Sequence, residues 1–112
     1  MEQQYRLRKN AQFRYIYRKG KGGACRELAA AFVRGPRLLV GFAVSKKIGN
    51  AVTRNRVKRR LREAFKRELP ALKRGQYVIT AREAAADADF ARLHGSLRYL
   101  LRRQGLYRED AK

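Results

Sequence analysis

The densest cluster of chemically active side chains lies between residues 54 and 67, where eight residues are Lys or Arg and only Glu63 is acidic. A helix over this stretch places like charges at positions i and i+4, which costs stability in water. Solvated helices usually alternate the sign of their charges along one face. A basic run of this kind is typical of a helix that binds phosphates. The sequence therefore predicts a polyanion-binding helix rather than a solvated charged face.

The whole chain shares this charge. It has 112 residues, with 29 Lys and Arg against 9 Asp and Glu, which gives a formal net charge of +20. Self-repulsion of this size opposes a compact state unless a polyanion relieves it. Arg outnumbers Lys by 20 to 9. Because the guanidinium group grips phosphate with two parallel hydrogen bonds and stacks on bases, this ratio favours nucleic acid over an anionic membrane.

Few residues could support catalysis by the protein itself. The single cysteine excludes a disulfide framework and a thiolate zinc site, and the single histidine excludes a histidine cluster. Glu83, Asp87 and Asp89 could hold a metal in a protein nuclease, but acids near a helix start are explained more simply by the helix dipole. No apolar run is long enough for a membrane span, and the first residues lack the apolar core of a signal peptide. We therefore expect no metal site on the protein and a cytoplasmic location.

The length and composition favour one folded domain, since Leu, Ile, Val and Phe make up 23% of the chain. Apolar spacing predicts helices over about 10–19, 50–69 and 87–104, and buried strands over 38–44 and 76–81. Residues 26–34 are ambiguous between helix and strand, and residues 20–23 are interpreted as a short flexible connection. A helix between two strands indicates a βαβ unit in an α+β sandwich. A sheet covered on one face leaves its other face available for a ligand.

Three segments resemble one family. The strongest is Lys46-Lys47-Ile48-Gly49-Asn50-Ala51 followed by Arg54-Asn55-Arg56-Val57-Lys58-Arg59 and Arg62-Glu63. This segment closely resembles the "RNR" signature of the bacterial ribonuclease P protein subunit. The opening run from Arg6 to Tyr17 and the strand end from Ile79 to Arg82 are also similar to that family. The resemblance extends over about residues 5–105.

The resemblance implies a single RNA-binding domain over residues 1–112, with an α+β fold. That fold is a small two-layer α/β sandwich like that of some ribosomal proteins, with a left-handed βαβ crossover. It makes residues 26–34 a strand. It also implies the accessory subunit of a ribozyme that removes the 5′ leader from precursor tRNA, with hydrolysis carried out by the RNA subunit and its Mg²⁺. The expected partners are ribonuclease P RNA and precursor tRNA, with no role for DNA or membranes.

The resemblance also assigns site residues, none of them catalytic. Docking on the RNA subunit is expected of Arg54, Asn55, Arg56, Lys58, Arg59 and Arg62. Leader binding is expected of Phe13, Arg14, Tyr17, Lys46, Lys47 and Arg82. Aromatic faces that stack on bases and cations that follow phosphates bind single strands of any sequence, which suits many different leaders. Apolar spacing alone would make Phe13 a core residue, so both interpretations of that ring stay open.

One position departs from the family pattern. The first strand of the family usually offers an aromatic side chain to the leader cleft, and by register that position is Ala31 here. Phe32 is its neighbour, and a shift of one residue points to the opposite face of a sheet. We therefore expect Phe32 in the core unless a bulge turns it. The alternative function is that of a structural, ribosomal-type RNA-binding protein. A DNA-binding regulator is disfavoured because a strand, not a helix, precedes the basic helix.

Overall fold

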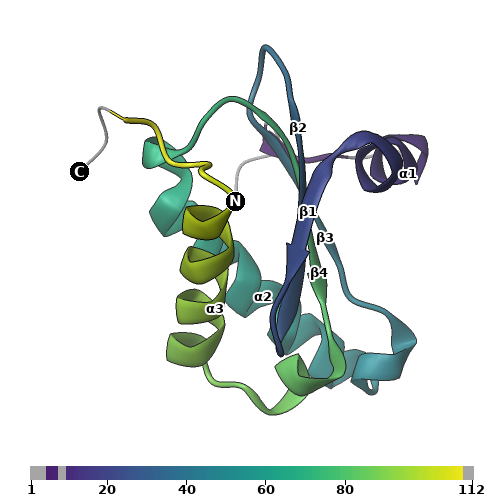
Figure 1. Cartoon of the computed structure of the whole chain (residues 1–112). Helices are drawn as coiled ribbons and strands as arrows, with labels where there is room; N and C mark the ends of the chain where they lie inside the picture. Colours follow the sequence, from purple (N-terminus) through teal and green to yellow (C-terminus); the bar gives the residue numbers. More distant parts are fainter. Residues whose placement is uncertain (1–4, 8–9, 110–112) are drawn as a thin grey trace.

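The structure of this chain is a computed structural model that describes residues 5–7 and 10–109 (Figure 1). Residues 1–4, 8–9 and 110–112 lie outside the described part, as do most of the first residues tested for a signal peptide. The extent of the predicted domain stays a prediction. The elements, in chain order, are α1 (Asn10–Lys19), β1 (Lys21–Ala24), β2 (Leu28–Arg34), β3 (Leu39–Ala43), η2 (Lys46–Ile48), α2 (Ala51–Glu68), η3 (Leu69–Ala71), β4 (Gly75–Ala81), η4 (Glu83–Asp87) and α3 (Phe90–Arg103).

The strands form one mixed sheet in the order β1-β2-β4-β3. β2 is antiparallel to both of its neighbours, whereas β3 and β4 are parallel and are connected by α2. This β3–α2–β4 unit confirms the predicted βαβ arrangement within an α+β fold. The hand of the crossover stays a prediction.

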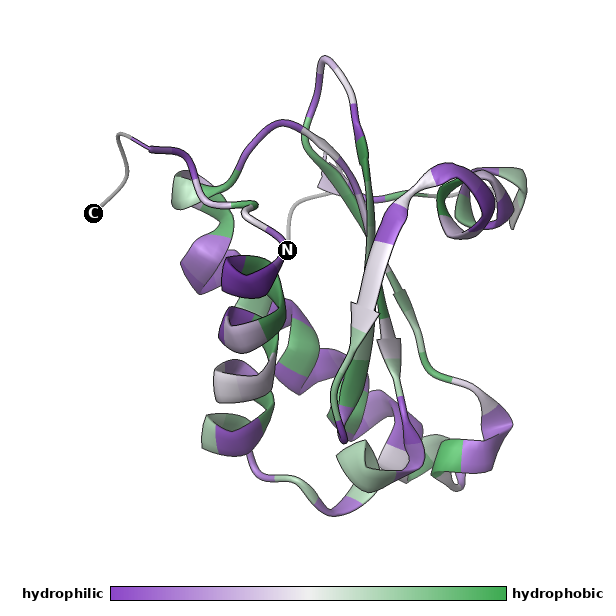
Figure 2. Cartoon of the chain, in the orientation of Figure 1, coloured by the Kyte–Doolittle hydropathy of each residue, from purple (hydrophilic) through white to green (hydrophobic). Residues whose placement is uncertain are grey.

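The two faces of the sheet have different coverings (Figure 1). α2 and α3 cover one face and build the main core, whose fully buried members include Val40, Val57, Leu61, Phe65, Tyr77, Ile79, Leu93 and Leu97. In Figure 2, hydrophobic and hydrophilic residues alternate along α3, as expected of a helix with one face in a core. α1 lies on the opposite face, where a smaller cluster joins Leu7, Ile16, Ala31 and Val78. The sheet is therefore enclosed on one face and only partly covered on the other.

Residues 28–34 form strand β2, as the family resemblance implies. The β2–β4 register runs without a break from Leu28 opposite Ala81 to Arg34 opposite Gly75, so no bulge is present. Phe32 accordingly faces the main core, with its ring centroid 4.8 Å from that of Tyr77. Ala31 faces α1 and is 7% exposed. The expectation that Phe32 stays in the core is confirmed.

Two element predictions need correction. The glycine-rich residues interpreted as a flexible connection form edge strand β1, because backbone pairing with β2 compensates for the poor strand propensity of glycine. The helix predicted from residue 87 begins at Phe90, since Asp89 accepts the backbone N–H of Arg92 at 2.8 Å and fixes the first turn there. The preceding residues 83–87 form η4 instead. α2 begins where expected, with the Asn50 side chain accepting the N–H of Thr53 at 2.9 Å.

Candidate nucleic-acid interface

The basic helix α2 combines a buried apolar stripe with a charged outer surface. Val57, Leu61, Ala64 and Phe65 are fully buried against the sheet and α3, as their spacing predicts. Of the six residues expected to contact the RNA subunit, Asn55 and Arg59 are exposed, and Arg54, Arg56, Lys58 and Arg62 are half-buried. The structure therefore places all six on one element and outside the core.

Two arginines of α2 also bind the protein itself. Arg60 Nη1 donates to the carbonyl oxygen of Ala88 at 2.8 Å, and Arg56 Nη2 makes a long contact of 3.5 Å with the carbonyl oxygen of Ala86. Ala86 belongs to η4 and Ala88 directly follows it, so these arginines connect α2 to η4 and to the residues that lead into α3. The Nε atoms of Arg54 and Arg56 are buried without a hydrogen-bond partner among the described residues. Arg56 is therefore partly occupied by the fold, and on the exposed side of α2 the Arg67 Nε lies 3.6 Å from a carboxylate oxygen of Glu63.

A hollow of about 520 Å³ lies on the outer surface of α2. It is lined by Arg6, Arg59, Arg60, Arg62, Glu63, Lys66 and Phe90. A parallel β-bridge between Arg6 and Val40 holds the N-terminal segment beside β3. The Arg67 guanidinium lies over the Phe90 ring, 4.6 Å from its centroid. Sequence reasoning missed Arg6 and Phe90 as contributors, although Arg6 belongs to the segment that resembles the family.

α1 presents the aromatic residues that were expected to bind the leader. Phe13 is half-buried against the smaller cluster, and its ring lies directly over Gly41 of β3. Tyr17 is 49% exposed, and its hydroxyl is hydrogen-bonded to the Thr80 hydroxyl of β4. Arg14 is exposed on the same helix. Phe13 thus packs on the sheet while part of the residue stays exposed, and its role in leader binding stays a prediction.

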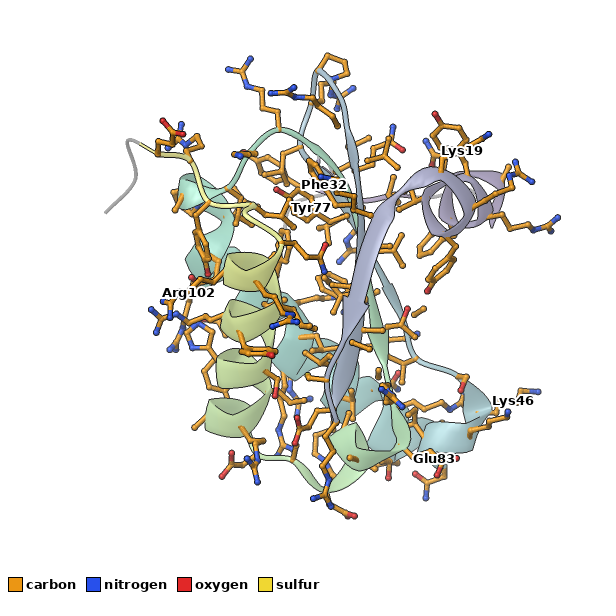
Figure 3. All side chains as sticks on the ribbon, in the orientation of Figure 1. Lys19, Phe32, Lys46, Tyr77, Glu83 and Arg102 are labelled. Atoms are coloured by element: carbon orange, nitrogen blue, oxygen red, sulfur yellow. The ribbon has the colours of Figure 1, made fainter. Side chains whose placement is uncertain are left out.

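The other cations expected to bind the leader lie at the carboxyl ends of β3 and β4. Lys46 and Lys47 are exposed on η2, which is anchored by the buried Ile48. Arg82 is exposed and donates from Nη1 to the carbonyl oxygen of Cys25 at 2.9 Å. In Figure 3, Lys46 lies at one end of the molecule and Lys19, the last residue of α1, toward the other. Because β3 and β4 are parallel and Ala43 pairs with Thr80, the segments that carry these cations follow the same end of the sheet, next to the Thr80 residue that Tyr17 contacts.

The acidic residues near η4 differ in their surroundings. Asp89 caps α3, and Glu83 and Asp87 are exposed. Within residues 5–7 and 10–109, no three His, Cys, Asp or Glu side chains come close enough together to hold a metal ion.

Two buried carboxylates hold the core elements together instead. Glu27 accepts a hydrogen bond from Ser96 Oγ at 2.8 Å and lies 3.6 Å from Arg92 Nε. The hydrogen bond from Ser96 lowers the pKa of Glu27 and burial raises it, and the pKa stays below its ordinary value. Glu68 accepts from Tyr107 at 2.7 Å and is 2.7 Å from His94 Nε2.

Burial raises the pKa of Glu68, but the hydrogen bonds from His94 and Tyr107 outweigh it and lower the pKa overall. Burial, together with the bond to Glu68, raises the pKa of Tyr107 to about 12. His94 thus links α3 to the end of α2 through Glu68.

Comparison with known proteins adds independent evidence. A family model described as Ribonuclease P matches residues 1–105. The chain is 40% identical over 114 residues to the ribonuclease P protein component of Bacillus velezensis, covering 99% of this chain and 98% of that protein. It superimposes on a mutant of the Staphylococcus aureus RNase P protein with a TM-score of 0.89 at 35% identity, covering 96% of this chain and 93% of the other.

The RNase P protein of Thermotoga maritima gives a TM-score of 0.78 at 28% identity, covering 88% of this chain and 96% of the other. Among the described residues, no helix has both the length and the apolar character needed to cross a bilayer. The family match, the full-length relatives and the shared fold agree with the RNR segment on α2. The chain belongs to the ribonuclease P protein family.

Proposed function

We propose that this chain binds the catalytic RNA of ribonuclease P and the 5′ leader of precursor tRNA, and so assists Mg²⁺-dependent removal of the leader. The observation that carries the proposal is the separation of two RNA-binding chemistries on one small fold. One surface, on α2, is rich in cations. The other, on the α1 side of the sheet, combines exposed aromatic residues with cations.

The α2 surface suits a folded RNA. Its outer cations come from a rigid helix whose opposite face is fully buried, so they are presented at fixed spacing. A folded RNA offers phosphates at fixed spacing as well, and each neutralised phosphate releases condensed counterions. Arg54, Arg56, Lys58, Arg59 and Arg62, together with Asn55, would form this contact.

The α1 side of the sheet suits a single strand. Phe13 and Tyr17 would stack on bases, while Arg14, Lys46, Lys47 and Arg82 would follow the phosphates. These contacts read no base edges, so they accept leaders of different sequence. They also make leader-bearing tRNA a better ligand than mature tRNA.

The chemistry of cleavage falls to the RNA in this proposal. Mg²⁺ would be held mainly by the RNA subunit and the substrate, where it would activate water as the nucleophile and stabilise negative charge at the scissile phosphate. The protein would contribute substrate binding and screening of phosphate repulsion. Its place of action would be the cytoplasm, where precursor tRNA is processed.

A cleavage assay on precursor tRNA at near-physiological Mg²⁺ tests the proposal. Protein alone, a bacterial ribonuclease P RNA alone and the mixture are compared, with affinities for precursor and mature tRNA measured in parallel. We expect efficient formation of the mature 5′ end only in the mixture, and tighter binding of precursor. Equal affinity for both tRNAs at matched salt would contradict the leader assignment. Co-purification with ribosomal particles instead of one small stable RNA would favour a structural RNA-binding role.

A further inference from the structure

Two of the three aromatic rings on α1, those of Phe13 and Tyr17, contact the sheet beneath the helix. Phe13 and Tyr17 lie one helical turn apart, and neither ring is fully buried. A ring that is free to change rotamer loses side-chain entropy when a base stacks on it, whereas a ring that is already fixed does not. What fixes each ring therefore affects how tightly a strand binds.

Gly41 of β3 makes room for the Phe13 ring. Gly41 is buried, and a Cβ built there would overlap with the Cζ and Cε1 atoms of that ring and lie 3.1 Å from its Cε2 atom. The glycine is not required by the backbone, since the glycines with positive φ are Gly49, Gly75 and Gly105. Close approach of the aromatic ring is thus the reason for glycine at this position.

Thr80 of β4 holds the Tyr17 ring. The two hydroxyls are hydrogen-bonded, and they join α1 to the strand across the open side of the sheet. The strand neighbours of Thr80 in the register are Ala29 and Ala43, whose side chains have no polar atom to offer. The Thr80 hydroxyl therefore anchors a side chain that is otherwise half exposed to solvent.

We infer that Gly41 and Thr80 are positioning residues for leader binding: they fix the Phe13 and Tyr17 rings in the orientation that stacks on the bases of a single RNA strand. This inference rests on the proposed function of the α1 side of the sheet. Neither residue needs to touch the RNA. Their effect passes through the two rings, so it depends on the leader and not on the RNA subunit.

A double-mutant cycle tests the Thr80 contact. The variants Thr80→Val, Tyr17→Phe and the double variant are assembled with ribonuclease P RNA, and their affinities for precursor and mature tRNA are measured. We expect each single variant to bind precursor about 3- to 10-fold more weakly, since a net hydrogen bond is worth about this factor. The double variant should be no weaker than either single variant, because one contact is lost in all three.

Three controls separate positioning from folding. Thr80→Ser keeps the hydroxyl and should retain wild-type affinity for precursor. Tyr99→Phe removes a hydroxyl from a residue of similar exposure on α3 and should have no effect. Affinity for mature tRNA and for the RNA subunit should stay unchanged in every variant. Additive losses in the double variant, or an unchanged affinity in Thr80→Val, would overturn the inference.

Gly41 is tested in two backgrounds, because Gly41→Ala alone could disrupt packing. In the Phe13→Ala background the added methyl group has space, so Gly41→Ala should have no further effect on stability or on leader affinity. In the wild-type background it should lower the affinity for precursor. A further loss in the Phe13→Ala background would show that Gly41 acts through another contact and would overturn its assignment.

The tRNA affinities of the wild-type holoenzyme distinguish a failure of the leader-binding function from a failure of the positioning inference. Equal affinity for precursor and mature tRNA would refute the leader-binding function, and the positioning inference would be refuted with it. Preference for precursor that Thr80→Val leaves intact would refute the positioning inference alone.

Discussion

Removing two outer cations of α2 should weaken binding to the RNA subunit in a salt-dependent way. Arg59 is exposed and Arg62 half-buried, and both line the 520 Å³ hollow on the helix surface. In contrast to Arg56 and Arg60, they make no hydrogen bond to the carbonyl groups near η4. The double variant Arg59→Gln/Arg62→Gln should therefore lose charge without losing fold.

The magnitude follows from counterion release. Each neutralised phosphate contributes about 0.7–0.9 to the slope of log K against log salt, so two lost contacts should reduce the slope by about 1.4–1.8. If the electrostatic contribution vanishes near 1 M salt, the same change predicts roughly 15- to 30-fold weaker binding at about 0.15 M salt. The melting temperature should stay close to that of the wild type.

The assay is equilibrium binding of the protein to ribonuclease P RNA over a salt series at fixed Mg²⁺. Arg102→Gln/Arg103→Gln is the matched control, since it makes the same change in net charge on two exposed residues at the end of α3. We expect the control to change the slope by less than about 0.5. If the two double variants reduce the slope equally, diffuse net charge rather than the α2 surface drives binding, and the reasoning is refuted.

The remaining predictions concern stability. Phe32→Ala should destabilise the protein by about 3 kcal/mol without a selective loss of affinity for precursor tRNA, as measured by denaturant unfolding and tRNA binding; a selective loss at unchanged stability would place Phe32 among the leader-binding residues. Asp89→Ala should cost about 1 kcal/mol, because the N-cap of α3 is lost, and an unchanged unfolding midpoint would contradict that role. Because the pKa of Glu68 is lowered in the folded state, its contribution to stability is present above its ordinary pKa and is lost as the pH falls through the folded value. Unfolding followed between pH 6 and pH 3 should show a smaller loss of stability for Glu68→Gln than for the wild type, and parallel curves would contradict this. Because the pKa of Tyr107 rises to about 12, its contribution should be lost as the pH rises from about 10 through that value, and Tyr107→Phe should remove the corresponding step from an absorbance titration.

The periodicity of apolar residues predicted the helices because the buried side of each helix is set by residues close together in sequence. Val57, Leu61 and Phe65 recur on one side of α2, and burial against the sheet agrees with that pattern. Residues 28–34 could not be assigned locally, because a run of alanines is compatible with helix and strand. Pairing with β4 on one side and β1 on the other decides the outcome. β1 directly precedes β2, but β4, which pairs along the whole length of β2, follows only after β3 and α2.

The chemistry of the RNA-binding surfaces was predictable, but the division of work among their residues was not. Arg56 and Arg60 have the same side chain as Arg59, yet the fold uses the first two to bind carbonyl oxygens near η4. That difference depends on where α3 begins relative to α2, which no local pattern contains. For the same reason the sequence does not reveal the role of Thr80. Its hydroxyl is hydrogen-bonded to Tyr17, which lies 63 positions away in sequence.

The placement of the acids explains how a chain with a net charge of +20 keeps its RNA-binding surfaces positive. Glu27 and Glu68 are largely buried and bind groups of α3 and the following segment, and Asp89 caps α3. Each of these carboxylates stabilises the main core side of the sheet. A carboxylate among the outer cations of α2 competes with phosphate for the same guanidinium groups, and Glu63, 3.6 Å from Arg67 Nε, has that position. Because Glu27, Glu68 and Asp89 bind groups of the protein instead, they stabilise the fold without neutralising the surfaces proposed to bind RNA, and the remaining repulsion between cations is relieved when RNA binds.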